Sequence, residues 1–248
     1  MKRMKRVLAF YLAAVMFISA CPVANAAAVT EETQKTVSET SASVNELEEN
    51  ISVQSEVTDF AYTVLNGAFC QITGYTGTDT EVVIPAEIDG YIVQSIKDNV
   101  FKGKTSITKV VLPSTLETIG NSQFSGCTSL TDVQMNEGIT TIPQSAFEGC
   151  TSLETIVLPE TVTSIGNSAF KGCTALKSVT LPQAVKRVES YAFANCTDLT
   201  EFVFNEGFET IYSYAFSNCT GLVTIDLPDS VTKLASRAFY KCTNLAEV

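Results

Sequence analysis

The chain has 248 residues, 45% of them apolar, so it can bury a sizeable core. It contains no His and no Trp, and its 16 basic against 27 acidic residues give a net charge of −11. Without His, the chain can form neither a Ser-His or Cys-His nucleophile pair nor a His-ligated zinc site. Nucleic acids and anionic lipid surfaces attract clustered Lys and Arg, so we expect neither as a partner of this acidic chain.

Residues 1–26 have the layout of a secretory signal peptide. A basic start precedes an apolar run over 7–20, and small residues before the end favour cleavage after Ala26. The run is shorter than the roughly 20 residues of a bilayer-spanning helix, so we predict no membrane span. Residues 18–21 also resemble a bacterial lipobox, which leaves a lipid anchor at Cys21 as the alternative. Both interpretations predict a secreted or cell-surface protein.

Residues 27–57 are predicted to be a disordered acidic linker. The segment is rich in Ser, Thr and Glu and has no Gly, Pro or aromatic residue. Such a composition buries too little apolar surface to offset the chain entropy lost on folding. Val37, Val44 and Ile51 recur every seven residues, so a short coiled-coil seam is the alternative.

The rest of the chain is a repeat with a period of 23 residues. Self-similarity at such a period indicates a solenoid, in which each unit buries its apolar face by stacking on its neighbours. Residues 107–248 hold six full units and a seventh that begins at Leu245 and is cut off at Val248. The repeated positions include Phe101, Phe124, Phe147, Phe170, Phe193, Phe216 and Phe239, and Cys127, Cys150, Cys173, Cys196, Cys219 and Cys242.

Each unit is expected to begin with a short strand. In the unit that starts at residue 153, Ile156 and Leu158 should point inward, while Thr155 and Val157 point outward. Pro159 suits the strand exit because it has no amide hydrogen to donate. One helical turn is expected later in the unit, over 167–171.

The residue before each repeat Cys is expected to have a left-handed backbone conformation. It is Gly126, Gly149 and Gly172 in three units and Asn in the next two, and these residue types tolerate a positive φ. Lys241 departs from this rule. We therefore expect strain, or a different turn, in the last full unit.

The pattern LxxLxLPxxLxxIxxxAFxxCxx resembles the BspA-like, or Treponema-type, leucine-rich repeats of bacterial surface proteins. The resemblance covers residues 58–248. It implies a right-handed leucine-rich repeat solenoid with short parallel strands on the concave face and short helical or 3-10 turns on the convex side. Residues 58–106 would be the N-terminal capping unit, formed by a hairpin around Asn66-Gly67 and a degenerate repeat.

The resemblance also implies a protein-binding or adhesion scaffold whose partner is an extracellular or host-surface macromolecule. A polysaccharide-binding lipoprotein module, or a truncated fragment without its own ligand, are the alternatives. Solenoids offer extended concave faces to large ligands. Thr and Val are also simply good strand formers, which is the competing explanation for their presence there. The predicted ligand-binding positions are Lys109, Val111, Asp132, Gln134, Thr155, Val157, Ser178, Thr180, Glu201, Val203, Thr224 and Asp226.

Two other surface features bear on function. Glu201 and Asp226 fall on neighbouring strands about 7–8 Å apart, a separation found between glycosidase carboxylates. An open sheet face offers no pocket to desolvate an acid, so we predict no catalytic residues, no cofactor and no enzyme activity. Tyrosines near the convex turns of the last units make that side an alternative contact surface: Tyr191, Tyr212, Tyr214 and Tyr240.

The six repeat Cys stand in one column and are predicted to form a structural ladder of free, buried thiols. Their Cα–Cβ bonds should point in the same direction, whereas a disulfide needs these bonds directed toward each other. The chain has no C-x-x-C motif, so no metal site is predicted.

The unit that begins at Leu245 has nothing to cover it. Either the chain is a truncated relative of longer repeat proteins, or the open edge associates with another copy of itself.

Overall fold

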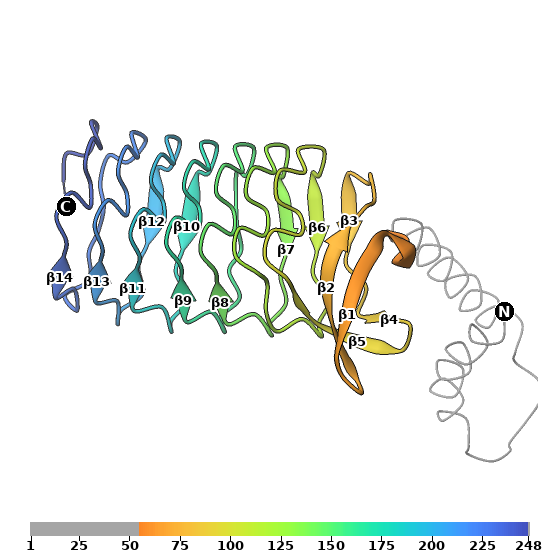
Figure 1. Cartoon of the computed structure of the whole chain (residues 1–248). Coiled ribbons are helices and arrows are strands. Elements are labelled where there is room, and N and C mark those ends of the chain that lie inside the picture. The colour runs from red at the N-terminus through yellow and green to blue at the C-terminus, as the bar shows by residue number, and fades with distance from the viewer. Residues whose placement is uncertain (1–54, 248) are drawn as a thin grey trace, which may run out of the picture. The chain divides into compact units, whose positions relative to one another are not determined.

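The computed structural model describes residues 55–247 (Figure 1). The predicted signal peptide, the lipobox at Cys21 and the linker up to residue 54 lie outside the described residues. Among residues 55–247, no helix has the length and apolar character needed to cross a membrane.

The N-terminal part is a four-stranded sheet in the order β1-β2-β5-β4. Its first two strands form the antiparallel hairpin that the Asn66-Gly67 turn predicts. The pairing of β2 with β5 is parallel, and a bridge from Ser95 to Thr118 continues this direction into the repeats. The elements are η3 (Val57–Asp59), β1 (Phe60–Asn66), β2 (Phe69–Tyr75), β4 (Glu87–Ile88) and β5 (Tyr91–Ile96).

The repeats form a solenoid of parallel coils, as the 23-residue period predicts. One row of strands comes from the start of each unit and lies at mid-height in Figure 1. Its members pair in parallel, 23 residues apart in the repeats, as two separate sheets, β3-β6-β7 and β10-β12. They are β3 (Glu81–Val83), β6 (Lys109–Val111), β7 (Asp132–Gln134), β10 (Ser178–Thr180) and β12 (Glu201–Val203).

This first row is interrupted twice within the described residues. The first interruption follows β7. The strand predicted from Thr155 is reduced to a single bridge with Ser178, and no ladder joins it to β7. Its side chains still alternate as predicted, since Val157 is 80% exposed while Ile156 is buried. The second interruption follows β12. A strand in every unit was therefore the wrong expectation, although the inward and outward pattern holds.

A second row of strands was not predicted. It runs along the lower edge of the solenoid in Figure 1 as one continuous five-stranded parallel sheet, β14-β13-β11-β9-β8. Each strand is only two residues long, too short to show alternation in the sequence. The strands are β8 (Thr141–Ile142), β9 (Ser164–Ile165), β11 (Arg187–Val188), β13 (Thr210–Ile211) and β14 (Lys233–Leu234).

The third side of each coil is a run of hydrogen-bonded turns. At 167–171, local bonds such as Lys171 N–H to Ser168 O (3.1 Å) alternate with bonds to the next coil, such as Phe170 N–H to Ala192 O (2.8 Å). Because alternate amides bond to the neighbouring coil, the segment does not continue as a helix.

The left-handed positions before each Cys are present in every full unit. Gly126, Gly149 and Gly172 have φ of 75–76°, and Lys241 keeps the same conformation with φ 61°. The last full unit thus keeps the same turn, and Lys241 bears the cost of a positive φ that Gly avoids. A second left-handed column was not predicted and comprises Ser122, Ser145, Ser168, Tyr191, Tyr214 and Arg237.

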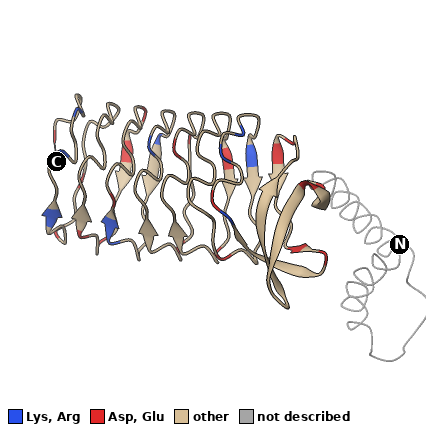
Figure 2. Cartoon of the chain, viewed as in Figure 1, with Lys and Arg blue, Asp and Glu red and all other residues tan. Residues whose placement is uncertain are grey.

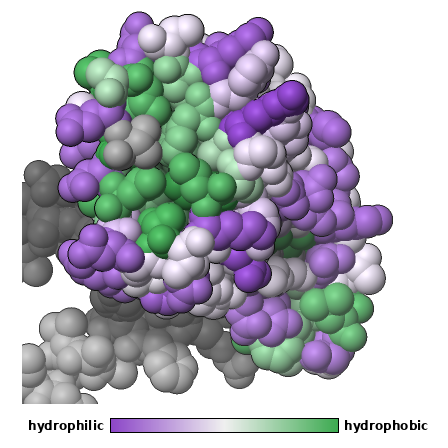
Figure 3. Space-filling model, turned by 90° about the vertical axis from the view of Figure 1, so that its left-hand side faces the viewer, coloured by the Kyte–Doolittle hydropathy of each residue, from purple (hydrophilic) through white to green (hydrophobic). Residues whose placement is uncertain are grey.

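The core is built from columns of identical side chains. Phe147, Phe170 and Phe193 are fully buried, and their rings stack with centroids 5.2 Å apart. Figure 3 looks onto the C-terminal coil, where apolar side chains are gathered at the surface. Leu234 is half exposed there, and Phe239 and Leu245 are only partly buried.

Asn205 replaces the strand-exit Pro of most units and is almost fully buried. Its side-chain amide donates to the carbonyls of Pro182 and Val185, both at 2.8 Å, and its Oδ1 accepts from Gly207 N–H at 3.0 Å. Asn205→Ala leaves these buried groups unpaired, so we expect the free energy of unfolding to fall by about 1–3 kcal/mol in chemical denaturation.

The matched control is Asn244→Ala. Asn244 is exposed and donates one hydrogen bond to Thr220 O at 2.8 Å, so its removal should change stability by less than about 0.5 kcal/mol. Equal losses in the two variants would contradict a role for Asn205 in tying adjacent coils together.

Candidate functional site

The outward residues of the first strand row stand in two columns, and we call this surface the strand face. In the first column Lys109 is in register with Asp132, and Ser178 with Glu201. The two interruptions of the ladder divide the columns into three segments, 109–134, 155–203 and 224–226. Most of the predicted positions are exposed, whereas Lys109, Val111, Asp132 and Ser178 are half-buried.

Three further positions of the strand face were not predicted from the sequence. Glu81 and Val83 on β3 lie in register with Lys109 and Val111. At the other end, Glu247 bridges to Thr224. A signal for the first two was present, because residues 81–85 repeat the pattern of 109–113 before the regular 23-residue spacing begins.

The charged side chains in the first segment of the strand face already contact one another. Lys109 Nζ lies 3.6 Å from Asp132 Oδ2, and Gln134 Nε2 donates to the same oxygen at 3.1 Å. Figure 2 shows this basic strand between the acidic strands β3 and β7. A half-exposed pair of this kind contributes about 0–1 kcal/mol to stability. These charges are therefore partly neutralised before any partner arrives.

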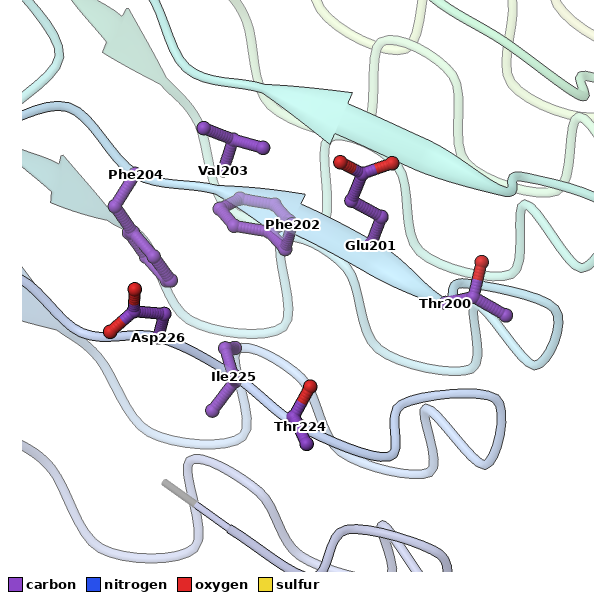
Figure 4. Close-up of a pocket in the computed structure, with 8 residues that line it drawn as sticks. All are labelled: Thr200, Glu201, Phe202, Val203, Phe204, Thr224, Ile225 and Asp226. Atoms are coloured by element: carbon purple, nitrogen blue, oxygen red, sulfur yellow. The ribbon is translucent and has the colours of Figure 1, made fainter.

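The second segment ends in a hollow of about 280 Å³ between β12 and the next coil (Figure 4). Both Glu201 and Asp226 line it. We expected no pocket on this face that desolvates an acid; a hollow is present here, and both of its carboxylates are exposed. Its full lining is Thr200, Glu201, Phe202, Val203, Phe204, Thr224, Ile225 and Asp226.

The hollow lies where the strand ladder is interrupted. Glu201 N–H donates to Lys177 O, and Val203 O accepts from Leu181 N–H, so β12 is bonded to β10 on one side. On its other side, no backbone hydrogen bond links 200–204 to 223–227 in the structure as described.

Aromatic side chains replace smaller ones in the unit that contains β12. Phe202 and Phe204 stand where the preceding unit has Val179 and Leu181. The Phe204 ring packs against Phe202 at 4.8 Å and Phe208 at 4.7 Å between centroids. The rings of Phe202 and Phe204 line the place where the ladder is interrupted.

Three of the four tyrosines of the predicted convex contact surface lie together. Tyr191 and Tyr214 stack with centroids 4.9 Å apart and planes at 4°, and Tyr240 packs against Tyr214 at 6.1 Å. Arg237 lies over Tyr214 at 5.6 Å and donates a hydrogen bond to its hydroxyl. Tyr212 instead packs beneath Lys233, whose Nζ lies 4.8 Å from the ring centroid.

The repeat Cys form a column of free thiols in the structure. Each thiol donates to the backbone carbonyl of the Phe 26 residues earlier, as Cys173 does to Phe147 at 3.1 Å. Burial raises the pKa of Cys127 to about 11 and that of Cys196 to about 12. The thiols of Cys127 and Cys196 are therefore neutral at physiological pH. Between residues 55 and 247, no group of three or more Cys, Asp or Glu is arranged to hold a metal ion.

Comparison with known proteins identifies the repeat. The family model of the BspA-type leucine-rich repeat region matches residues 94–220 and 163–248, with six copies. A leucine-rich repeat protein of T. pallidum has a similar crystal structure, with a TM-score of 0.74 and 32% sequence identity. The match covers 77% of this chain and 90% of that chain. No curated protein of similar sequence was found.

Two longer proteins are also similar in structure. A leucine-rich repeat protein from Bacteroides ovatus gives a TM-score of 0.72 at 30% identity, and a leucine-rich cell surface protein from Faecalibacterium prausnitzii gives 0.70 at 30%. Each match covers 76% of this chain but only 51% and 52% of the respective relative, so the chain spans about half their length. The family model covers more than half of the sequence, and this chain therefore belongs to the BspA-type leucine-rich repeat family.

Proposed function

We propose that this protein is an exported scaffold that binds an extended surface of another protein through its strand face. The observation that carries the proposal is the segment 155–203, where small and β-branched side chains stand in register and open to solvent. Val157 is 80% exposed and Val203 41%, beside exposed Thr155 and Thr180. Such a flat, mixed surface suits a large partner better than a small metabolite.

Two observations support the cellular location. Residues 1–26 have the composition of a signal peptide. The similar F. prausnitzii protein is described as a cell surface protein. The partner is accordingly an extracellular or host-surface protein, and the protein acts in attachment.

The strand face is tested with the double variant Thr155→Arg and Thr180→Arg. Two long charged side chains in the exposed columns should block a flat partner, so we expect saturable binding to be lost. Binding of the purified protein to a panel of extracellular-matrix proteins and complex polysaccharides is followed by biolayer interferometry. Proteolysis of the captured ligand and competition by free sugars distinguish a protein partner from a polysaccharide.

The matched control is the double variant Thr163→Arg and Thr232→Arg. Both threonines are exposed and precede strands of the second row, so the variant has the same charge change away from the strand face. Binding that survives in the strand-face variant, or that is lost equally in both, would overturn the proposal.

A further inference from the structure

The carboxylates of the hollow have no partner within the described residues. None of the ion pairs there includes Glu201 or Asp226, and no side chain donates a hydrogen bond to either. Asp132 in the first segment differs, because Lys109 and Gln134 already engage it. The hollow therefore presents two uncompensated negative charges.

The interrupted ladder also leaves backbone groups available at the hollow. Glu201 and Val203 bond toward β10, so the peptide N–H and C=O of Phe202, which alternate with theirs, face the interruption. On the next coil, Ile225 N–H donates to Glu247 O, away from the hollow. The peptide groups of Thr224 and Asp226 therefore face the interruption from the other side.

A planar aromatic surface completes the hollow. Figure 4 shows the Phe204 ring extending from the end of β12 toward Asp226, with Glu201 at the beginning of the strand. Phe204 is half-buried, and its ring packs on Phe202 and Phe208, so its position is held from behind. The first interruption of this row, after β7, has no such ring, because Val133 and Met135 occupy the corresponding positions.

The acceptors of the hollow match one side chain better than any other, whereas its free peptide N–H groups need backbone carbonyls of the same bound segment. Carboxylates and peptide carbonyls are acceptors, and a guanidinium carries five N–H donors in a planar fork and no acceptor. The guanidinium plane also stacks on aromatic rings. A Lys ammonium matches the charge but neither the planar shape nor the number of acceptors.

We propose that the hollow between β12 and residues 224–226 binds an arginine side chain from an extended segment of a partner protein. The guanidinium pairs with Asp226 and lies against Phe204, while Glu201 adds negative potential at the other end. This assignment rests on the proposed function and gives it a specificity-determining contact. It predicts that partners carry an exposed Arg flanked by residues that fit the flat strand face.

The experiment uses a pair of matched peptides as probes. Acetyl-Thr-Val-Arg-Val-Thr-amide and its citrulline analogue have nearly the same shape, but citrulline is uncharged. Titration is followed by amide chemical shifts in 15N NMR spectra. We expect the arginine peptide to shift the amides of 200–204 and 224–226 and to bind about tenfold or more tightly than the citrulline peptide, as charge-assisted hydrogen bonds require.

The variants Asp226→Asn and Glu201→Gln keep the shape of the lining and remove one charge each. We expect Asp226→Asn to weaken arginine-peptide binding about tenfold and Glu201→Gln to weaken it less. Asp229→Asn is the control, because Asp229 is exposed in the same unit but does not line the hollow. Equal affinity for both peptides, unchanged binding by Asp226→Asn, or shifts outside the hollow would overturn the assignment.

The peptide titration requires no macromolecular ligand. A negative result would therefore remove the arginine site but leave the test of the strand face at Thr155 and Thr180 standing. Conversely, loss of the strand-face proposal would leave a measured affinity of the hollow for arginine.

Discussion

Replacing Phe170 by Ala is expected to lower the free energy of unfolding by about 3–5 kcal/mol. The ring is fully buried and lies between those of Phe147 and Phe193, at 5.2 Å from each and nearly parallel to both. Solenoid stability is approximately a sum of unit and nearest-neighbour terms, so the resulting cavity weakens two interfaces at once. Guanidinium chloride denaturation, followed by circular dichroism, measures the change.

Phe239→Ala is the matched control at the same repeat position. Phe239 is only partly buried and stacks on Phe216 at 5.3 Å, with no further ring described beyond it. Its truncation should remove less packing and cost about half as much. If Phe170→Ala were no more destabilising than Phe239→Ala, the aromatic column would not be the continuous core that the stacking indicates.

The protein is expected to lose stability steeply as the pH rises from about 9 to 11. Burial raises the pKa of Cys127 to about 11, that of Cys196 to about 12, and those of Cys150 and Cys173 well above 9. In the unfolded chain these thiols ionise near pH 8.5.

The sign follows from proton binding. Above the unfolded pKa, the unfolded chain has released protons that the folded chain still holds, so rising pH favours unfolding. Each thiol removes about 1.4 kcal/mol per pH unit, so the four together remove about 6 kcal/mol per unit. This stabilisation is fully present below about pH 8.5 and is lost toward the folded pKa values.

The measurement is a set of denaturation curves between pH 8 and pH 11 in the presence of a phosphine reductant. Tyr and Lys also titrate in this range, so the informative quantity is the difference between variants. Cys173→Ala should reduce the slope of stability against pH by about 1.4 kcal/mol per unit, whatever its effect at pH 8. A slope unchanged by Cys173→Ala would mean that this thiol ionises without unfolding.

The sequence by itself determined the architecture, because each unit of the repeat places the same residue types in the same environment. Phe170 and Cys173 recur at a fixed spacing, and identical side chains at a fixed spacing stack in columns. The alternation around Val157 likewise placed the outward columns correctly, even in the unit whose strand is reduced to one bridge. Left-handed positions were predicted where Gly and Asn share a column, since only these residues reveal the conformation by their identity.

Other features were decided only by the tertiary structure. The two-residue strands of the second row are defined by pairing between coils, and no local pattern in residues such as Ser164 and Ile165 shows it. The second left-handed column contains Ser122, Tyr191 and Arg237, whose identities do not indicate a positive φ. Contacts with the coils on either side impose that conformation on them.

The hollow also combines a feature that the sequence predicts with one that only the tertiary structure decides. The sequence placed Glu201 and Asp226 on neighbouring outward positions, and that placement was sound. Whether two adjacent coils pair or separate depends on how the side chains behind the strand fill the core. Phe202 and Phe204 are apolar, as the repeat pattern requires, and the pattern alone does not distinguish them from Val or Leu. The ladder is interrupted beside them, and only this arrangement of the two coils brings the two carboxylates into one hollow.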